Sequence, residues 1–467
     1  MRQLILGLLV WFSAGASIAQ AAQNVDGFPA LGFAGTGFKV VDVSSGPSDV
    51  GRVLRIQPDG KLLMAGTCQS LEEFSQPKFC ATRLDRDGNY DSSFGFDGTV
   101  RFDRFEPQGI PKYTNLSDMV RLKDGRILFM GGDYIVDGEI LLAILTADGR
   151  TLDPGVVGGT GFIRFKYGAT NNSSFGNVVL EQADGKILVA GMMDRSGSTG
   201  SYYDMTVQRF LPDLSVDKNF GNQGYQIIPS SFSGGPDNYT TAANSVAVQT
   251  NGSIVLAGNE RTSVSTSQVA IVRLLQNGQL DSEFGPGSDG RVYFTSSNFD
   301  VANTVRFDQQ GRIVVAGYTA GDTNPGSRSG LINRLLANGS QDSSFNASAG
   351  VGHPQTFTVP VGSTNAPCNI VDLALPADGT VLAVGSLLDY YFTAVRLTPS
   401  GAFDSTFGVG GKSYGSFESS ASSTVVRSGA IAIGSGLMIA GASTGSDTKF
   451  GIAKLILDKV FANGFEN

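Results

Sequence analysis

The sequence is poor in the residues on which most catalytic and metal sites depend. Its 467 residues include one histidine, one tryptophan and three cysteines, and only 16% of them are charged. The single histidine, His353, has neither a nucleophile nor a second imidazole close to it in the sequence. A Ser-His-Asp triad and a multi-histidine metal site are both disfavoured. We therefore expect a protein without cofactor, metal or enzymatic activity.

Positive charge is also scarce. Lys and Arg number 34 against 42 Asp and Glu, the formal net charge is −8, and no basic run is present. Nucleic-acid binding requires clustered cations that neutralise phosphates, so no nucleic-acid partner is expected. The stretch 85–91 resembles a calcium loop only superficially, because its glycine is misplaced and no bidentate glutamate follows.

Long apolar runs are confined to the N-terminus. Arg2 precedes an apolar run from Leu4 to Phe12, and Ala19-Gln20-Ala21 offers a small-residue cleavage site. This order is typical of a secretory signal peptide spanning residues 1–21. No later segment is apolar enough to span a bilayer. The single tryptophan, Trp11, lies within this predicted signal peptide, so the mature chain has none. We expect the mature chain to be a secreted or periplasmic monomer without a transmembrane segment.

The three cysteines divide into a pair and a single residue. Cys68 and Cys80 flank one expected hairpin loop, and in an oxidising compartment they are predicted to form a disulfide. Cys368 is interpreted as a small buried apolar residue.

What the chain does contain is a repeat of about sixty residues. Each copy is a turn ending in glycine followed by an apolar strand that also ends in glycine, as in PDGKLLMAG. The spacings between successive final glycines are 65, 60, 67, 59, 68 and 56 residues. The seven copies end at Gly66, Gly131, Gly191, Gly258, Gly317, Gly385 and Gly441.

Each copy carries four strand signals, which near the second copy lie at 99–102, 119–122, 126–130 and 141–145. A D-G turn joins the second and third signals and suits a tight hairpin. Seven such units predict an all-β fold, a seven-bladed β-propeller of four-stranded antiparallel blades over residues 22–458. A β-solenoid is the competing architecture, but its coils of about 20–30 residues are shorter.

A linker with the pattern D-x-x-F-G follows most copies. Six linkers join the seven copies, and the strand that follows each linker also occurs at the start of the chain, as GTGFKVV from Gly35. We predict that this N-terminal strand completes the last blade, closes the ring and removes free sheet edges. The linkers begin at Asp91, Asp153, Asp217, Asp281, Asp342 and Asp404.

Five of these aspartates have an arginine eight residues earlier. A basic ring for an anionic ligand and a structural ion pair are the two interpretations. The second copy has Ile144 in place of arginine and has also lost Phe-Gly from its linker, which favours the structural interpretation, although Asp153 is retained. The predicted pairs are Arg83–Asp91, Arg209–Asp217, Arg273–Asp281, Arg334–Asp342 and Arg396–Asp404.

The period, the D-x-x-F-G linker and the P-D-G-K-[IL]-[VL]-x-A-G unit resemble the delta-60 repeat family of bacterial secreted proteins, over about residues 30–458. This resemblance implies a β-propeller and no defined activity. The C-terminal tail, residues 459–467, is similar to a short tail on exported proteins of some gammaproteobacteria. It is either an address or anchor, or a loosely ordered terminus.

Three functional hypotheses remain open. The leading one is an exported binding or scaffold propeller that holds an unknown protein or polysaccharide through loops at one ring face. An extracellular carbohydrate-active enzyme is the alternative; it rests on fold analogy and needs two carboxylates, for which Glu181, Asp308 and Asp372 are candidates. The third is a structural protein retained at the cell surface by its tail.

Overall fold

The computed structural model describes residues 26–44, 46–69, 77–102, 114–133, 138–169, 172–194, 203–231, 240–263, 265–347, 354–361, 364–387, 391–417, 423–432, 436–444 and 448–457. The predicted signal peptide and C-terminal tail lie outside these residues, and so does His353.

The chain folds into successive sets of four antiparallel strands. In the first six sets the strands pair in chain order. The sets are β2 (Ser48–Ile56), β3 (Leu62–Gln69), β4 (Lys78–Leu84), β5 (Thr99–Arg101); β6 (Asn115–Arg121), β7 (Ile127–Asp133), β8 (Glu139–Leu145), β9 (Phe162–Phe165); β10 (Ser174–Glu181), β11 (Ile187–Asp194), β12 (Tyr203–Phe210), β13 (Tyr225–Ile228); β14 (Thr241–Val248), β15 (Ile254–Arg261), β16 (Ser267–Leu274), β17 (Arg291–Phe294); β18 (Phe299–Phe307), β19 (Ile313–Ala320), β20 (Arg328–Leu335), β21 (Gln355–Phe357); and β24 (Cys368–Ala374), β25 (Val381–Leu387), β26 (Tyr391–Leu397), β27 (Lys412–Gly415). The expected all-β fold of four-stranded antiparallel sheets is confirmed.

A terminal set joins the two ends of the described chain. It consists of β28 (Ser423–Ala432), β29 (Gly436–Thr444) and β30 (Thr448–Ile456), and β1 (Phe38–Val41) pairs with β30 antiparallel. The other described elements are the hairpin β22 (Val359–Val361) and β23 (Thr364–Ala366) and two single-turn 3₁₀ helices, η2 (Tyr167–Ala169) and η3 (Pro325–Ser327).

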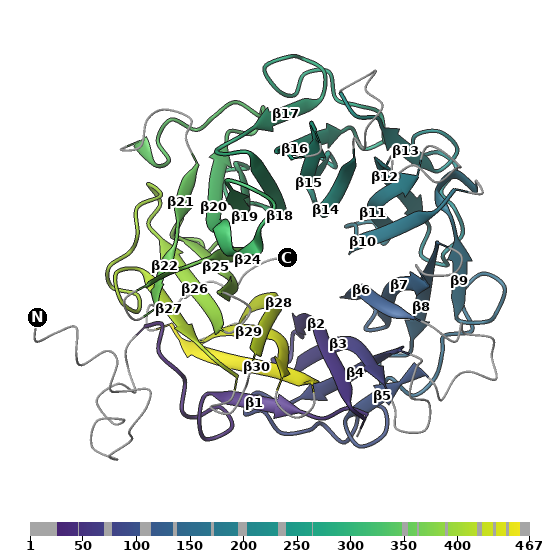
Figure 1. The fold of residues 1–467 in the computed structure, drawn as a ribbon. Coiled ribbons are helices and arrows are strands. Elements are labelled where there is room, and N and C mark those ends of the chain that lie inside the picture. The colour runs from purple at the N-terminus through teal and green to yellow at the C-terminus, as the bar shows by residue number, and fades with distance from the viewer. Residues whose placement is uncertain are drawn as a thin grey trace, which may run out of the picture.

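The sets lie around a common centre, with their first strands innermost (Figure 1). Each innermost strand packs against the innermost strands of the two neighbouring sets, and β2 contacts both β6 and β28. A β-bulge interrupts every innermost strand at the same place, for example between Gly51 and Val53 and between Ala302 and Thr304. The sequence pattern did not predict these bulges.

The two faces of the molecule differ in how they connect strands. On one face, which we call the turn face, five-residue turns join the first and second strands at residues 57–61, 122–126, 182–186, 249–253 and 308–312. Gly60 has a φ of +81°, and its N–H donates to the Gln57 carbonyl at 2.8 Å, so the repeated glycine is required by the turn. We call the opposite face the loop face; there the second strand connects to the third.

The apolar core is divided among the interfaces between sets. Alternate residues of β3 enter different clusters: Leu63 and Ala65 pack toward the second set, while Leu62 and Met64 pack toward the terminal set. Among the described residues, seven such clusters occur, each between two adjacent sets. Because both faces of a set are apolar, each set depends on two neighbours for its burial.

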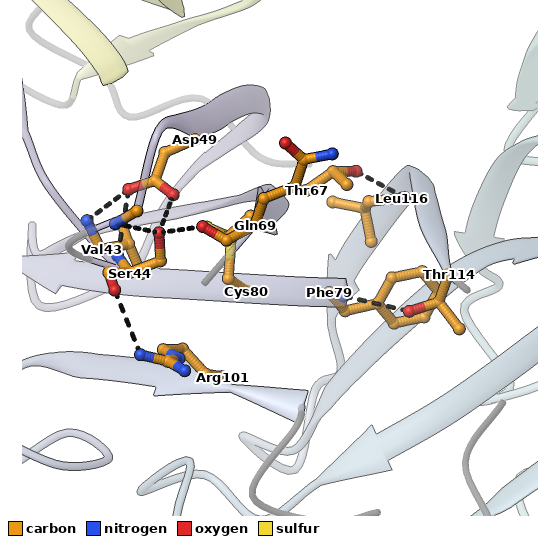
Figure 2. The surroundings of a disulfide bond; sticks show 12 residues. Val43, Ser44, Asp49, Thr67, Gln69, Phe79, Cys80, Arg101, Thr114 and Leu116 are labelled. Carbon is orange, nitrogen blue, oxygen red and sulfur yellow. Dashed lines mark hydrogen bonds between the residues drawn. A yellow bond between two sulfur atoms is a disulfide. The ribbon is translucent and has the colours of Figure 1, made fainter. Parts of the chain in front are cut away.

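The structure contains a disulfide between Cys68 on β3 and Cys80 on β4, with Cα atoms 5.9 Å apart (Figure 2). Both residues belong to the cluster between the first and terminal sets. Ser44, which follows β1, donates from its hydroxyl to the carbonyl of Gln69 at 3.0 Å beside the disulfide. The disulfide therefore cross-links the two strands of the hairpin that contacts the N-terminal segment.

Replacing Cys68 and Cys80 together by serine should lower the free energy of unfolding by about 2–3 kcal/mol, because the unfolded chain loses a closed loop of about a dozen residues. Urea denaturation measures the change. Cys368→Ser is the control for a buried cysteine outside the disulfide and should cost clearly less, about 1 kcal/mol. Equal destabilisation by both changes would contradict the assignment.

Candidate functional site

The linkers that follow the third strands hold the arginines and aspartates selected from the sequence. In five sets the arginine Nε lies 2.7–2.9 Å from Oδ2 of the linker aspartate. The arginine side chains are between 2% and 13% exposed. The structure thus brings together Arg83 and Asp91, Arg209 and Asp217, Arg273 and Asp281, Arg334 and Asp342, and Arg396 and Asp404.

Each of these guanidinium groups also reaches beyond its own ion pair. Arg334 lies 4.6 Å from the ring centroid of Phe345 in its linker, and its Nη1 donates to the Pro399 carbonyl of the sixth set at 2.7 Å. One side chain therefore joins a strand, a linker and the next set. The equivalent contacts are Arg83 with Phe94 and Ala147, Arg209 with Phe220 and Gln276, and Arg273 with Phe284 and Ala337.

The second set keeps the ion pair by a different route. Ile144 is buried where the other sets have arginine, and Arg126 on the turn face places Nη1 2.5 Å from Oδ2 of Asp153. The position of Arg126 is also cationic in three other sets, where Lys61, Lys186 and Arg312 lie 2.9, 3.8 and 3.5 Å from the linker aspartates. This second cation was missed, although it follows the turn glycine directly, in D-G-K, D-G-R or Q-G-R.

These contacts leave the arginines little capacity for a ligand. Burial alone would raise the pKa of Asp342, but hydrogen bonds from Ser344 and Arg334 hold that pKa below its ordinary value. A turn-face cavity of about 560 Å³ between the third and fourth sets is lined in part by Lys186 and Arg209, which already contact Asp217.

A second cavity, of about 370 Å³, opens on the loop face of the fifth set. Hydroxyl groups dominate its wall, and no aromatic ring lines it. Such a volume is at the lower end of what small-ligand sites enclose. Its lining residues are Ser296, Ser297, Thr319, Ala320, Gly321, Ser327, Ser329, Pro354 and Thr356.

Two residues that line this cavity donate to a carboxylate that is only partly satisfied. Asp300 is fully buried; its Oδ2 accepts the N–H groups of Ser296 and Ser297 at 2.6 and 3.2 Å, while its Oδ1 has no hydrogen-bond partner among the described residues. The hydroxyl of Thr319, opposite Asp300 on β19, also has none. A buried carboxylate oxygen without a hydrogen-bond donor is costly.

The first set shows the same position filled. Asp49 is the equivalent of Asp300, and its Oδ2 accepts the N–H groups of Val43 and Ser44 (Figure 2). The hydroxyl of Ser44 donates to Asp49 Oδ1 at 2.5 Å. The contrast between these two carboxylates makes the loop face of the fifth set distinctive.

Cys368 of the sixth set stands at the position equivalent to Asp49 and Asp300, two residues before the bulge. Its sulfur accepts the N–H of Gly330, as Thr241 Oγ1 accepts the N–H of Met205 at 2.8 Å in the fourth set. Burial raises the pKa of the Cys368 thiol to about 12. The thiol therefore serves as a hydrogen-bond acceptor between sets and is not a nucleophile at neutral pH.

The acidic residues proposed as catalytic candidates have separate partners. Asp372 pairs with Arg306 at 2.8 Å, Asp308 with Arg312 at 2.6 Å, and Glu181 accepts the N–H of Lys123 at 2.8 Å. A further ion pair, Arg55–Asp118 at 2.9 Å, joins the first and second sets.

In the stretch that resembles a calcium loop, Asp85 Oδ1 accepts the N–H groups of Asp87 and Asn89, each at 2.9 Å. This is the hydrogen bonding of a turn stabilised by its own aspartate. Among the described residues, no three His, Cys, Asp or Glu side chains are grouped so that they could hold a metal ion.

Comparison with known proteins agrees with the fold. Four segments, residues 57–94, 182–220, 249–284 and 311–345, match the family described as "Domain of unknown function (DUF5122) beta-propeller". Each match runs from the turn between the first two strands to the linker phenylalanine, so the chain carries β-propeller repeats. No curated protein matches the chain. Within the described residues, no helix has the length and apolarity needed to cross a membrane.

Solved structures similar to this chain include PorZ, a surface component of the type-IX secretion system of Porphyromonas gingivalis, at 10% identity and a TM-score of 0.44. The match covers 88% of this chain and 47% of PorZ, so this chain spans about half the length of that relative. The α-L-arabinanase of Penicillium chrysogenum has 13% identity, a TM-score of 0.42 and coverage of 90% and 98%. The WD40 domain of Toxoplasma gondii coronin has 9% identity, a TM-score of 0.44 and coverage of 90% of each chain.

Replacing Arg334 by methionine should lower the free energy of unfolding by about 3 kcal/mol, because Asp342 keeps a buried charge with only the more distant Arg312 near it. Urea denaturation measures the loss. Arg86→Met, on the exposed part of a turn, is the control and should change stability by less than about 0.5 kcal/mol. Similar small effects of both changes would contradict a structural role for the pair.

Proposed function

We propose that this chain is an exported, non-catalytic binding protein whose loop face holds a protein or polysaccharide ligand. The observation that carries the proposal is the difference between the two faces. The turn face is occupied by contacts that recur from set to set, whereas the loop face contains the cavity with the unsatisfied Asp300 next to it.

Connection lengths support the same assignment. Between second and third strands they vary from three residues, 388–390, to eight, as at 70–77 and 195–202, while most connections between first and second strands have five. In repeat proteins, insertions that differ between copies gather on one face, and that face is often the binding face. A binding role also fits carboxylates that are individually paired and do not face each other across one cavity.

The scaffold for this role is a seven-bladed propeller closed by its N-terminal strand. The pairing of β1 with β30 supports this, with Phe38 opposite Ala453 and Val41 opposite Phe450. Ring closure removes the free edge of β30 and lets the first and terminal sets bury their facing sides.

Residues near the N-terminus also make contacts with the sixth set that, between other sets, come from the turn after the third strand of the next set. Gly408 N donates to the Asp26 carbonyl at 2.8 Å, as Gly285 N donates to the Asn338 carbonyl at 2.9 Å between the fourth and fifth sets. Arg396 Nη1 contacts the Asp26 carboxylate. Asp26 therefore takes the place of a residue that, in the other sets, lies in the turn after the third strand of the next set.

A seventh linker precedes β1. Ala34 N donates to the Asp87 carbonyl at 2.9 Å, and a Cβ on Gly88 would come within 3.1 Å of the Phe33 ring. Phe33 therefore has the role of the linker phenylalanines, although Ala30 stands where the other linkers have aspartate.

Export is the remaining part of the proposal. Its support is the sequence of residues 1–21 together with the disulfide, which is stable in an oxidising compartment.

Thermal unfolding of residues 22–467 against a panel of polysaccharides tests the binding role. A ligand of the folded state should raise the midpoint by mass action, and Thr356→Trp should abolish the rise by filling the loop-face cavity. Val409→Trp, at a 73% exposed position on the turn face, is the control. A rise that survives Thr356→Trp would place binding elsewhere.

Phe33→Ala tests ring closure. Because Phe33 is 1% exposed, its truncation should cost about 3–4 kcal/mol in urea denaturation if the N-terminal segment completes the last blade. Phe96→Ala, at a ring that is 45% exposed, should have little effect. If Phe33→Ala is equally harmless, the N-terminal segment does not complete the blade.

A further inference from the structure

We propose that Arg55 and Arg306 form an oxyanion-binding site at the common centre of the sets, for a carboxylate, sulfate or phosphate group. The site is distinct from the loop-face cavity and does not depend on the proposed function. Both arginines lie on innermost strands, three residues after the bulge, in β2 and β18 (Figure 1).

Each guanidinium is held from one side. Arg55 Nη2 contacts Asp118 Oδ1 of the next innermost strand at 2.9 Å, and Arg306 Nη2 contacts Asp372 Oδ1 at 2.8 Å. Their Nη1 groups donate to backbone carbonyls of their own strands, at Leu54 and Val305. A guanidinium has five N–H donors, and the remaining donors have no acceptor among the described residues.

The exposed fractions of the side chains indicate which charge a ligand at the centre would contact. The side chains of Arg55 and Arg306 are 33% and 41% exposed, whereas those of Asp118 and Asp372 are only 12% and 11% exposed. The carboxylates therefore lie behind the guanidinium groups and orient them, and the accessible groups are donors with positive charge. The planar fork of arginine suits the two oxygens of a carboxylate or sulfate.

The two arginines lie on innermost strands that are not adjacent to each other. β6 packs against β2 and β10, while β18 packs against β14 and β24. Burial raises the pKa of Asp118, and the charges of Arg55 and of Arg306 both oppose that rise. Both arginines lie on strands that surround the common centre, and we therefore place the anion there, between the two cations.

The protein as a whole does not attract anions. Its formal net charge is −8, so an anion needs local positive charge to bind. Other innermost strands contribute neutral amides: Asn177 and Asn244 donate to the Ala243 and Ala302 carbonyls of the next strands at 2.9 and 3.0 Å. These amides add no negative charge to the centre.

Titration calorimetry of residues 22–467 with sodium sulfate and with an oligogalacturonate tests the site. Binding should weaken as NaCl is raised, because the interaction is electrostatic. It should fall at least about tenfold in Arg55→Gln with Asp118→Asn, and likewise in Arg306→Gln with Asp372→Asn. Each double variant removes one ion pair without changing net charge, so no buried aspartate is left unpaired. Arg86→Gln is the control and should bind as the natural chain does.

The ¹⁵Nε signals of the arginines identify the contact directly. Sulfate should shift the signals of Arg55 and Arg306, and not that of Arg86. Tighter binding of the oligogalacturonate than of sulfate would identify a glycan-borne carboxylate, while sulfate binding alone would identify a free ion; either supports the site. Unchanged signals, equal shifts at Arg86, or equal shifts by neutral maltotriose would overturn the proposal.

Discussion

The constraint on which this structure depends is that every four-stranded set has two apolar faces. In β3, neighbouring residues such as Leu63 and Met64 enter different clusters, so a single set in isolation would expose one of them to water. The only way to cover both faces of every set with like sets is to arrange them around a centre. The twist of each sheet, the seven clusters between sets and the contact of β2 with β28 are consistent with this arrangement.

Apolar contacts alone do not fix how neighbouring sets are oriented. The contacts of the linkers do. In Arg334 one planar cation contacts the linker carboxylate, the linker ring and a carbonyl of the next set, which fixes the angle between neighbours. In the second set, the part of this arrangement that is kept is a cation beside the linker aspartate. This set has Ile144 in place of the arginine yet keeps a cation on Asp153 through Arg126, so neutralisation of the half-buried carboxylate is retained although a different residue supplies the charge.

Much of the fold was predictable because it is periodic and local. The D-G turns, the strands and the residues eight apart in the linker pairs all repeat within short windows of sequence. What escaped prediction depends on contacts between sets. Arg55 and Asp118 are 63 residues apart and share no motif, and the linker before β1 was hidden because Ala30 replaces its aspartate. The partly satisfied Asp300 could not be distinguished from Asp49 until the hydroxyl of Ser44 was seen to complete only the latter.

Contacts that repeat from set to set stabilise the fold, and contacts that do not repeat are the candidates for function. On the turn face, the polar groups of the linkers are committed to neighbouring sets, so a ligand there would have to compete with contacts that hold the fold together. The innermost strands differ from one another at equivalent positions: arginine at 55 and 306 corresponds to Val120, Leu180 and Ala247 elsewhere. A contact needed by the architecture would recur at most interfaces, as the linker contacts do. Arginines at only two of these positions are better explained by a ligand at the centre than by the packing of the sets.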